Sequence, residues 1–319
     1  MKLKGLVQEM EYIKGTTDFI LEGESVVTLG KFDGIHRGHS KLLQKVKELS
    51  GNTYRTVMFT FAVHPKVYLK GETPKVLMTN TERYYYMKQQ GYDYLIEYPF
   101  MEQTASMEPE DFVEEVLIKQ LSAAHVVVGA DFRFGHGRRG SIDTLKRYER
   151  HGCFQVHVME KEQYEGRDIS STLVRSEVEM GRMEEVTKLL GHPYTITGEV
   201  EYGRQIGRTL GIPTTNIMPS DNKLLPPYGV YFTKTIFQGK AYKGITNIGC
   251  KPTIADELRR GVETYLFDFS GNLYGELLTV ELYKYHRPEM KFPDIQALKQ
   301  QMENDIEKAK NYDFEKGGV

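Results

Sequence analysis

The first half of the chain alternates short apolar runs with amphipathic helical patterns, and this alternation limits the possible folds more than any other feature. Runs rich in β-branched and aromatic residues predict strands at 25–29, 56–61, 94–98, 125–129 and 154–159. Apolar residues at helical spacing predict helices at 40–49, 81–90, 108–120, 142–151 and 171–180. Such alternation is typical of an α/β domain with a mostly parallel sheet and helices on both faces. Ligands of these sheets bind at the carboxyl ends of the strands.

The second half has a different pattern. Helical periodicity ends after residues 184–191, and short strands are predicted at 194–201, 229–236, 240–248, 262–267 and 277–285. Turn residues separate these strands, which predicts an all-β domain in the form of a small antiparallel barrel. A terminal helix is expected to pack on the barrel wall through the apolar stripe of Ile295, Leu298, Met302 and Ile306. We therefore predict two domains, residues 1–186 and 187–319.

Composition limits the class of protein and its compartment. With 319 residues, 39% of them hydrophobic and 27% charged, the chain is typical of a soluble protein with two ordinary domains. The net charge of −2 gives no basic footprint, so no nucleic-acid partner is expected. No run approaches the roughly 18 apolar residues of a membrane span, and no signal-peptide pattern is present, so no membrane partner is expected. Cys153 and Cys250 are predicted to be small core residues in a reducing compartment. We expect a cytoplasmic monomer or weak homo-oligomer.

A glycine-rich turn with two histidines lies between the first predicted strand and the first predicted helix. Gly30 and Gly34 allow a tight turn and a close approach to a ligand, and the free N–H groups at a helix start favour an anion. His36 and His39 are three residues apart on the first helical turn, so both can face the same anion. This pattern predicts a nucleotide-phosphate site in which imidazoles, charged or neutral, stabilise charge on phosphate oxygens. The alternative is two surface histidines in an ordinary βα loop.

Two later segments of the first half carry related chemistry. Ser171, Thr172 and Arg175 open a predicted helix, where hydroxyls and a guanidinium can hold phosphate oxygens. The alternative is that the hydroxyls only cap the helix. The loop at 130–140 combines aromatics, arginines and glycines, which suits a flat ring next to a phosphate. The alternative for this loop is a flexible basic segment.

The second half contains a glycine-rich segment that suits a phosphate. Gly203, Gly207 and Gly211 recur every four residues, a spacing typical of a loop whose backbone amides line an anion. Thr214 and Asn216 are separated by one residue in an extended stretch, so their side chains project to the same side. A hydroxyl and an amide carbonyl are neutral oxygen ligands that a nucleotide-bound Mg²⁺ can accept. The segment therefore predicts a second nucleotide site.

Glu263 is the candidate base of the second half. Its carboxylate stands in an otherwise apolar and aromatic predicted strand, where a charge is unfavourable unless it has a task. The alternative is a glutamate that faces water from an edge strand.

The motifs of both halves resemble those of known families. Gly30-Lys-Phe-Asp-Gly-Ile-His-Arg-Gly-His39 is similar to the signature of the HxGH nucleotidyltransferase superfamily. Residues 198–216 resemble the flavokinase signature, and matching stretches follow at 227–231, 246–253, 262–265, 273–276 and 287–292. Over roughly residues 23–309 the chain resembles the bacterial bifunctional riboflavin kinase/FAD synthetase family.

This resemblance implies a Rossmann-like nucleotidyltransferase domain with a parallel sheet, followed by a flavokinase-type antiparallel β-barrel with a terminal helix. The barrel would make FMN and ADP from riboflavin and ATP. The first domain would make FAD and pyrophosphate from FMN and a second ATP. Both reactions should need Mg²⁺, because each acts on a polyphosphate whose negative charge must be neutralised. Riboflavin, FMN and ATP are therefore the expected binding partners.

The resemblance also implies roles for individual residues. Glu263 would take the proton of the terminal ribityl hydroxyl, and His36 and His39 would act at the α-phosphate. Contacts to nucleotide and phosphate are implied for Gly30, Phe32, Asp33, Gly34, Ser171, Thr172, Arg175, Gly207, Arg208 and Gly211. Flavin contacts are implied for Asp131, Phe132, Phe134 and Arg287, and metal contacts for Thr214 and Asn216. The chain departs from the family at Ala62 and Val63, where an acidic residue and a proline are usual.

Three other functions fit parts of the pattern. A riboflavin kinase with a relic first domain would make FMN but no FAD, which the change at Ala62 and Val63 makes conceivable. A non-catalytic flavin-binding protein would have no need of both a base and a leaving-group clamp. An RNA-binding barrel is disfavoured by the net charge of −2.

Overall fold

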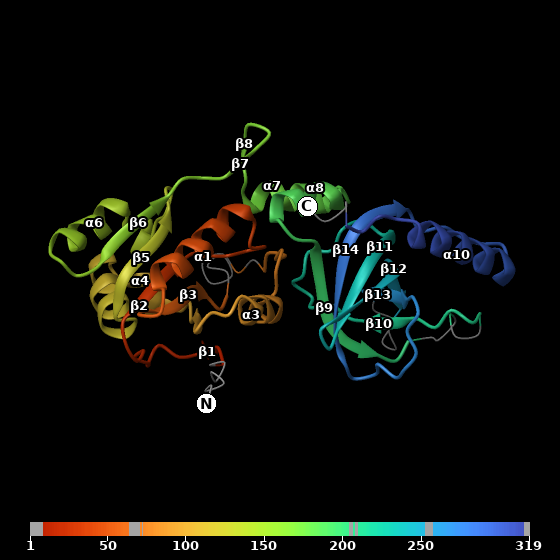
Figure 1. Cartoon of the computed structure of the whole chain (residues 1–319), viewed down its shortest axis with the longest axis horizontal. Helices are drawn as coiled ribbons and strands as arrows, with labels where there is room; N and C mark the ends of the chain where they lie inside the picture. Colours follow the sequence, from red (N-terminus) through yellow and green to blue (C-terminus); the bar gives the residue numbers. More distant parts are fainter. Residues whose placement is uncertain are drawn as a thin grey trace, which may run out of the picture. The chain divides into compact units, whose positions relative to one another are not determined.

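The computed structural model of the chain describes residues 9–63, 71, 73–203, 207, 210–252 and 258–315. The chain forms two compact units, which Figure 1 shows in sequence colours. The first comprises Met1–Pro74 and Arg83–Ile169, and the second comprises Lys75–Glu82 and Ser170–Val319. The second unit thus takes in a short segment from the first half of the chain. The division near residue 187 remains a prediction about where the two activities separate.

A six-stranded parallel sheet forms the centre of the first unit (Figure 1). In spatial order β1-β4-β3-β2-β5-β6, its strands are β1 (Glu11–Lys14), β4 (Tyr94–Tyr98), β3 (Arg55–Phe61), β2 (Ser25–Leu29), β5 (Ala123–Gly129) and β6 (Gln155–Met159). All neighbouring strands are parallel, which confirms the predicted α/β sheet. The sequence pattern does not predict β1, because its four residues are only partly buried and give little periodic signal.

Helices connect these strands. They are α1 (Arg37–Ser50), α3 (Asn80–Gln89), α4 (Glu102–Ser106), α5 (Pro109–Asp111), the π-helix η1 (Phe112–Gln120), the 3₁₀ turn η2 (His136–Arg138) and α6 (Ile142–Arg150). A small hairpin of β7 (Gln163–Tyr164) and β8 (Arg167–Asp168) follows β6. The single helix predicted at 108–120 is a short α-helical turn that continues as a π-helix. Hydrophobic spacing does not reveal this change in hydrogen-bond pattern.

Both faces of the sheet are buried. Val27, Val57 and Val126 belong to a core cluster that also contains Phe112 and Leu117 of η1. The strand residues between them point to the opposite face, where the buried apolar stripe of α1 contacts β2, β3 and β5. Burial on both faces explains why these strands read as continuous apolar runs.

A closed six-stranded antiparallel barrel forms the centre of the second unit (Figure 1). Its strands are β9 (Tyr194–Glu201), β10 (Thr215–Ile217), β11 (Gly229–Phe237), β12 (Lys240–Pro252), β13 (Leu258–Leu266) and β14 (Leu277–Arg287). Helices α7 (Ser171–Glu179) and α8 (Met183–Leu190) precede the barrel, and α10 (Ile295–Lys310) follows it. The predicted barrel and terminal helix are confirmed. The unpredicted β10 is only three residues long, yet it closes the barrel by pairing with β9 and β13.

Two predictions about packing need correction. The terminal helix packs on the barrel as predicted through Ile306, which joins a cluster with the buried Ala309, whereas Ile295 of the predicted stripe is 58% exposed. Cys153 and Cys250 are both exposed. Cys153 lies in the turn after α6, and Cys250 lies near the end of β12. A single small side chain carries no periodic signal that separates such positions from the core.

The short segment from the first half is held in the second unit by a buried ion pair. Nζ of Lys223 lies 2.7 Å from Oε2 of Glu82, and the two side chains are 1% and 2% exposed. The same ammonium donates to the carbonyl oxygen of Leu77 at 2.7 Å and lies 4.3 Å from the centre of the Tyr194 ring. Glu82 also accepts the backbone N–H of Thr197 at 3.0 Å. Each charge is therefore paired and hydrogen-bonded, the condition under which buried charges are tolerated.

Breaking this pair on one side should destabilise the second unit strongly. Lys223→Met and Glu82→Gln each leave a buried group without its partner, and we expect each to lower the free energy of unfolding by about 3–5 kcal/mol. The double variant should lose less than the sum of the two. Lys188→Met, which removes one member of an exposed pair, is the control and should lose less than about 1 kcal/mol. Urea unfolding measures these changes, and single-variant losses no larger than the control's would contradict the role of the pair.

Candidate active sites in the two units

Loops that follow neighbouring strands of the first unit meet at one edge of its sheet. β3, β2 and β5 are parallel neighbours, so their carboxyl ends at Phe61, Leu29 and Gly129 lie at the same edge. The turn with the two histidines follows Leu29, and the loop with Asp131 follows Gly129. Both predicted segments therefore lie at the edge where such sheets bind ligands.

The departure at Ala62 and Val63 follows β3 at this same edge. The backbone N–H of Ala62 donates to the carbonyl oxygen of Tyr98 at 3.0 Å, and Val63 is 45% exposed. A neutral, apolar pair thus stands at the edge of the sheet. His64, in the next part of this loop, lies outside the described residues.

His36 is the N-cap residue of α1, and its ring lies against that of His39. Nδ1 of His36 accepts the backbone N–H of His39 at 3.4 Å. The two imidazoles are stacked, with ring centres 3.8 Å apart and planes 18° apart. Phe32 meets His39 edge-on, with ring centres 5.2 Å apart. The structure thus brings the two histidines together at a helix start, where backbone N–H groups lack helical partners.

Apolar packing holds the turn before the histidines in a strained shape. Phe32 and Ile35 have φ angles of 46° and 39°, in the left-handed region that residues other than glycine seldom adopt. Both side chains are fully buried. A Cβ at Gly30 would come within 3.1 Å of the Phe32 ring, and one at Gly38 within 3.2 Å of the His36 ring. Phe32 therefore supports the turn from the core, and the glycines make room for both rings.

Both imidazoles are neutral at neutral pH. Burial lowers the pKa of His36 to about 4. Burial above all, and then the electrostatic effects of the neighbouring His36 and Arg83, hold the pKa of His39 well below its usual value. Because Nδ1 of His36 accepts a hydrogen bond, its proton lies on Nε2, and that N–H can donate to an anion. Nδ1 of His39 is buried and has no hydrogen-bond partner within the part of the chain that the structure describes.

An ion-pair cluster fixes the first turns of α1. Glu162 lies 2.7 Å from Nη2 of Arg37 and also contacts Nζ of Lys41. These cations, Lys41 above all, hold the pKa of Glu162 below its usual value. Glu162 follows β6, so it comes from the same edge of the sheet. Sequence reasoning misses this residue, because a lone glutamate after a strand belongs to no motif.

The loop after β5 is anchored by one of its aromatic residues. Phe134 is 8% exposed and belongs to the core cluster, and its ring fills the space left by the absent side chain of Gly140. Phe132 is half-buried and stacks on Phe134, with ring centres 5.5 Å apart. Asp131 is exposed and lies 3.3 Å from Nζ of Lys161. Asp131 and Phe132 can therefore reach a ligand, whereas Phe134 holds the loop in place.

The predicted cluster of hydroxyls and a guanidinium opens α7 in the second unit. The N-cap of α7 is Ser170, whose Oγ accepts the backbone N–H of Leu173 at 3.3 Å. Ser171 and Thr172 lie inside the first turn, and Arg175 follows on the next turn. Capping is therefore performed by Ser170 and not by the two predicted hydroxyls.

The barrel places two predicted site residues and one further polar residue in a single row. The strand register pairs Asn216 with Glu263, and Glu263 with Asn247. Directly paired residues point to the same face of a sheet, so these three side chains are neighbours. Sequence reasoning does not single out Asn247, whose only signal is its place in the matching stretch 246–253.

Thr214 contacts the predicted base directly. Its Oγ1 donates to Oε1 of Glu263 at 2.6 Å, so the hydroxyl proton points at the carboxylate and the oxygen lone pairs remain available. Oδ1 of Asn216 is buried and finds no hydrogen-bond partner among the described residues. A Cβ at Gly203 would collide with the Asn216 amide, and one at Gly207 would come within 3.3 Å of Thr214 Oγ1. These glycines let the backbone approach both candidate metal ligands.

Arg287 is engaged by α10. Its Nε and Nη2 donate to the carboxylate of Asp305 at 3.0 and 2.6 Å, and its Nη1 donates to the carbonyl oxygen of Pro288 at 2.9 Å. Asp305 is 1% exposed and also accepts Nε2 of Gln301 at 2.8 Å. The guanidinium therefore ties α10 to the end of β14, and its contact with a flavin stays a prediction. Arg208 lies outside the described residues.

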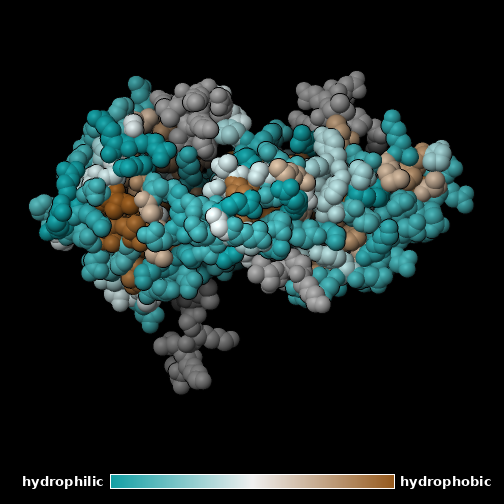
Figure 2. All heavy atoms as spheres, turned by 90° about the horizontal axis from the view of Figure 1, so that it is seen from above, coloured by the Kyte–Doolittle hydropathy of each residue, from teal (hydrophilic) through white to brown (hydrophobic). Residues whose placement is uncertain are grey.

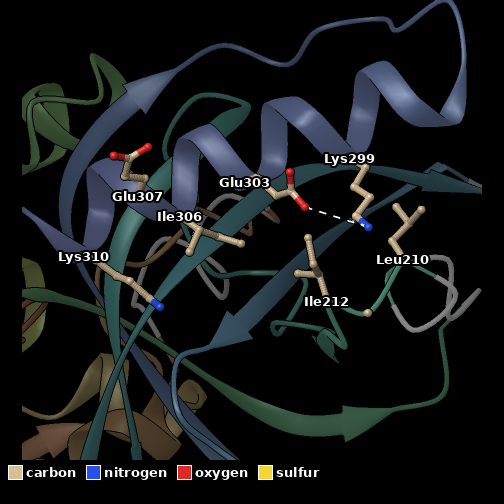
Figure 3. A pocket seen from close by; sticks show the side chains of 8 residues that line it. Leu210, Ile212, Lys299, Glu303, Ile306, Glu307 and Lys310 are labelled. Atoms are coloured by element: carbon tan, nitrogen blue, oxygen red, sulfur yellow. Dashed lines mark ion pairs between the residues drawn. The ribbon is translucent and has the colours of Figure 1, made fainter.

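An open groove of about 570 Å³ lies between α10 and the end of the glycine-rich segment (Figure 3). This volume is within the usual range for small-molecule sites. Its walls combine apolar and charged side chains: Leu210, Gly211, Ile212, Lys299, Glu303, Ile306, Glu307 and Lys310. In Figure 3 the ion pair of Lys299 and Glu303, 3.9 Å long, lies along the α10 wall, opposite Leu210 and Ile212. The groove thus adjoins the predicted phosphate segment at Gly211.

The described residues also limit other kinds of site. Within these residues, no group of three or more His, Cys, Asp or Glu side chains could hold a metal ion. The face in Figure 2 is mostly hydrophilic, and its hydrophobic residues gather in small areas. In the described part of the chain, no helix is long and apolar enough to span a membrane.

Comparison with known proteins covers both units. The model of the FAD synthetase family matches residues 20–173, and that of the riboflavin kinase family matches residues 190–313. Proteins named bifunctional riboflavin kinase/FMN adenylyltransferase are similar over most of the chain. The one from Listeria monocytogenes is 34% identical over 293 residues, covering 91% of this chain and 93% of its own. The one from Bacillus subtilis is 35% identical over 298 residues, with the same coverage of 91% and 93%.

A solved structure extends this comparison to the fold. The crystal structure of a Streptococcus pneumoniae protein described as a macrolide-efflux protein matches with a TM-score of 0.83 and 30% identity. The match covers 95% of this chain and 99% of that one.

Proposed function

The chain belongs to the family of bifunctional riboflavin kinases/FMN adenylyltransferases, and we propose that its two reactions use the residue clusters described above. The enzyme phosphorylates riboflavin with ATP to give FMN and ADP, and it adenylylates FMN with ATP to give FAD and pyrophosphate. The relatives are named for both activities, which favours two working sites over a relic first domain or a non-catalytic flavin binder.

In the kinase reaction, we propose that Glu263 accepts the proton of the ribityl hydroxyl that attacks the γ-phosphate of ATP. The 2.6 Å hydrogen bond from Thr214 to Glu263 is the observation that carries this assignment. It fixes the orientation of the carboxylate. Phosphoryl transfer depends mostly on positioning and charge neutralisation, so a base held in place can take the proton late in the reaction.

The metal of this reaction is proposed to be Mg²⁺, bound to the nucleotide and to Thr214 and Asn216. The Asn216 Oδ1, which has no partner among the described residues, and the lone pairs of the Thr214 hydroxyl are neutral oxygen donors of the kind this ion accepts. When bound, the ion supplies positive charge to the polyphosphate. Thr214 also contacts Glu263, so the metal ligands and the base would serve the same phosphate.

Removing the Asn216 amide should raise the Mg²⁺ requirement of the kinase. Asn216→Ala should need at least about tenfold more Mg²⁺ for half-maximal FMN formation, because one oxygen ligand is lost. Asn216→Asp keeps an oxygen at the site and should need less Mg²⁺ than Asn216→Ala. Adenylylation of supplied FMN, measured on the same proteins, is the control and should keep its Mg²⁺ dependence. An unchanged requirement in Asn216→Ala would contradict the metal assignment.

In the adenylylation reaction, we propose that His36 and His39 act as neutral hydrogen-bond donors. Negative charge grows on the α-phosphate and on the departing pyrophosphate, and donors already in place stabilise it without reorganisation. The stacking of the two rings and their lowered pKa values support donors over cations. The turn at residues 30–34 would bind the nucleotide of this reaction. Ser171, Thr172 and Arg175 of α7 are proposed separately as phosphate ligands.

We propose a separate flavin contact in each unit. In the first unit, Asp131 and Phe132 would contact FMN from a loop that Phe134 anchors. In the second unit, the groove at Ile212 would hold the ring system of riboflavin, because its walls combine apolar surface with charged side chains. Arg287 would shape this groove through its hold on α10.

Several remaining predictions concern the chain as a whole. We propose that the kinase residues lie in the part of the chain that begins near residue 187, and that the enzyme works in the cytoplasm as a monomer or weak homo-oligomer. A kinase fragment that begins near residue 187 would lack Glu82 and leave Lys223 buried without its partner. Residues 75–82 therefore belong in any stable kinase fragment.

A further inference from the structure

Glu162 ties the start of α1 to the segment that follows β6. Its carboxylate lies 2.7 Å from Nη2 of Arg37 and also contacts Nζ of Lys41. The Glu162 side chain is 14% exposed, whereas those of Arg37 and Lys41 are 39% and 48% exposed. The least exposed member of this cluster is thus a single carboxylate that faces two cations of one helix.

Glu162 supplies a charge that α1 itself lacks. The first turn of α1 contains no acidic residue, and it begins with Arg37. A cation at the first helical position opposes the helix dipole, and a nearby carboxylate offsets this effect. The first turn of α1 therefore depends on a negative charge from another segment of the first unit.

The segment that carries Glu162 is fixed on both sides. The carbonyl oxygen of Glu162 accepts the backbone N–H of Ile169 at 2.8 Å, next to the paired strands β7 and β8 (Figure 1). On the other side, Nζ of Lys161 lies 3.3 Å from the carboxylate of Asp131 and 3.5 Å from that of Asp168. A carboxylate on an anchored backbone can hold the helix that it contacts in one position.

Glu162 and the His36 ring meet at the same point of this first turn. A Cβ at Gly38 would lie 3.2 Å from the His36 ring and 3.8 Å from Cβ of Glu162. The hydrogen bond that Nδ1 of His36 accepts from the backbone N–H of His39 is long, at 3.4 Å. Because this bond is weak, the position of the His36 ring depends on how firmly the turn that begins at Arg37 is held.

We propose that Glu162 is a positioning residue for the adenylylation reaction: through Arg37 it holds the first turn of α1, so that the His36 ring stays directed at the α-phosphate of ATP. This assignment rests on the proposed role of His36. Glu162 acts through the helix and not on the substrate. Small displacements matter here, since a misplacement of about 1 Å can slow a reaction roughly 10²-fold.

Kinetics of FAD synthesis from supplied FMN test the proposal. Glu162→Ala should lower kcat by roughly 10- to 100-fold, because the His36 donor is no longer aligned in the transition state. The KM for ATP should not rise, because the change removes a negative charge from the neighbourhood of the phosphates. Glu162→Gln keeps an oxygen that can accept a hydrogen bond from Arg37 and should lose less than Glu162→Ala. Glu115→Ala, which breaks an exposed ion pair in η1, is the matched control and should keep full activity.

A double-mutant cycle separates positioning from a general structural role. Because Glu162 acts through His36, its removal from a His36→Ala enzyme should change kcat by less than about threefold. Damage to the fold of the first unit would instead multiply with the loss caused by His36→Ala. The same cycle with Glu162→Gln, which keeps the volume of the side chain, serves if Glu162→Ala yields too little folded protein.

Each other outcome would overturn the proposal in a recognisable way. An unchanged kcat in Glu162→Ala would make the ion pairs a surface contact without a role in the reaction. A higher KM for ATP with an unchanged kcat would assign the ion pairs to nucleotide binding. Equal losses in the presence and absence of the His36 ring would show that Glu162 acts independently of that ring. A wrong assignment of His36 itself would show separately, as full FAD synthesis in His36→Ala.

Discussion

Glu263→Gln should lower the rate of FMN formation by about 10²- to 10⁴-fold, the usual contribution of one general base. Glutamine keeps the shape of the side chain, and its amide oxygen can still accept the hydrogen bond that Thr214 donates to Glu263. What is lost is the ability to take a proton, so the change tests chemistry more than packing. Adenylylation of supplied FMN should stay near wild type, because that reaction does not use Glu263.

Glu281→Gln is the matched control for this substitution. Glu281 is also a barrel glutamate, and burial raises the pKa of its carboxyl group. Its side chain does not belong to the row that contains Asn216 and Glu263. One of its carboxylate oxygens accepts a hydrogen bond from the Tyr283 hydroxyl at 2.9 Å. FMN formation should therefore remain within a few-fold of wild type in Glu281→Gln. A Glu263→Gln enzyme that turns riboflavin over as fast as this control would rule out the base assignment.

His36→Ala and His39→Ala should each lower the turnover of FAD synthesis by about 10²- to 10³-fold, the effect of losing one donor that acts on developing charge. Because such donors act more strongly on the transition state than on bound ATP, turnover should fall more than the KM for ATP rises. Riboflavin phosphorylation in the barrel should hardly change.

The neutral state of the histidines adds a second expectation. Burial lowers the pKa of His36 to about 4, so the kcat/KM of the wild type, which reports free enzyme, should show no inflection near the ordinary histidine value of about 6.5. His125→Ala is the control for the two histidine substitutions. The His125 ring is hydrogen-bonded to that of His157 near the start of β5, away from the carboxyl edge of the sheet. Full FAD synthesis in both His36→Ala and His39→Ala would remove the basis for the first site.

Periodicity was sufficient to predict both folds. The long buried strands of the sheet and the hairpin strands of the barrel have strong apolar patterns, and their predicted bounds agree with the structure to within a few residues. Short elements such as β10 carry almost no pattern, although β10 closes the barrel. The place of residues 75–82 in the second unit could not be predicted either. It depends on the pairing of Glu82 with Lys223, two charged residues that in sequence look like ordinary surface positions.

The candidate sites were predictable where the chemistry is local in sequence. The spacing of His36 and His39 places both rings on one helical turn, and the structure stacks them. The contact of Thr214 with Glu263 joins residues 49 positions apart, so only the strand pairing reveals it. The motifs also do not indicate which of their residues are buried. Phe134 belongs to the core, and both histidines are neutral because of their surroundings.

Mixing two variants tests the central claim, that one chain carries two independent sites, most directly. His36→Ala, Glu263→Gln and an equal mixture of both are each incubated with riboflavin, ATP and Mg²⁺, and the flavins are separated by chromatography. We expect His36→Ala alone to accumulate FMN, Glu263→Gln alone to leave riboflavin unchanged, and the mixture to make FAD. FAD formed by either variant alone as fast as by the mixture, or no FAD from the mixture, would contradict the account.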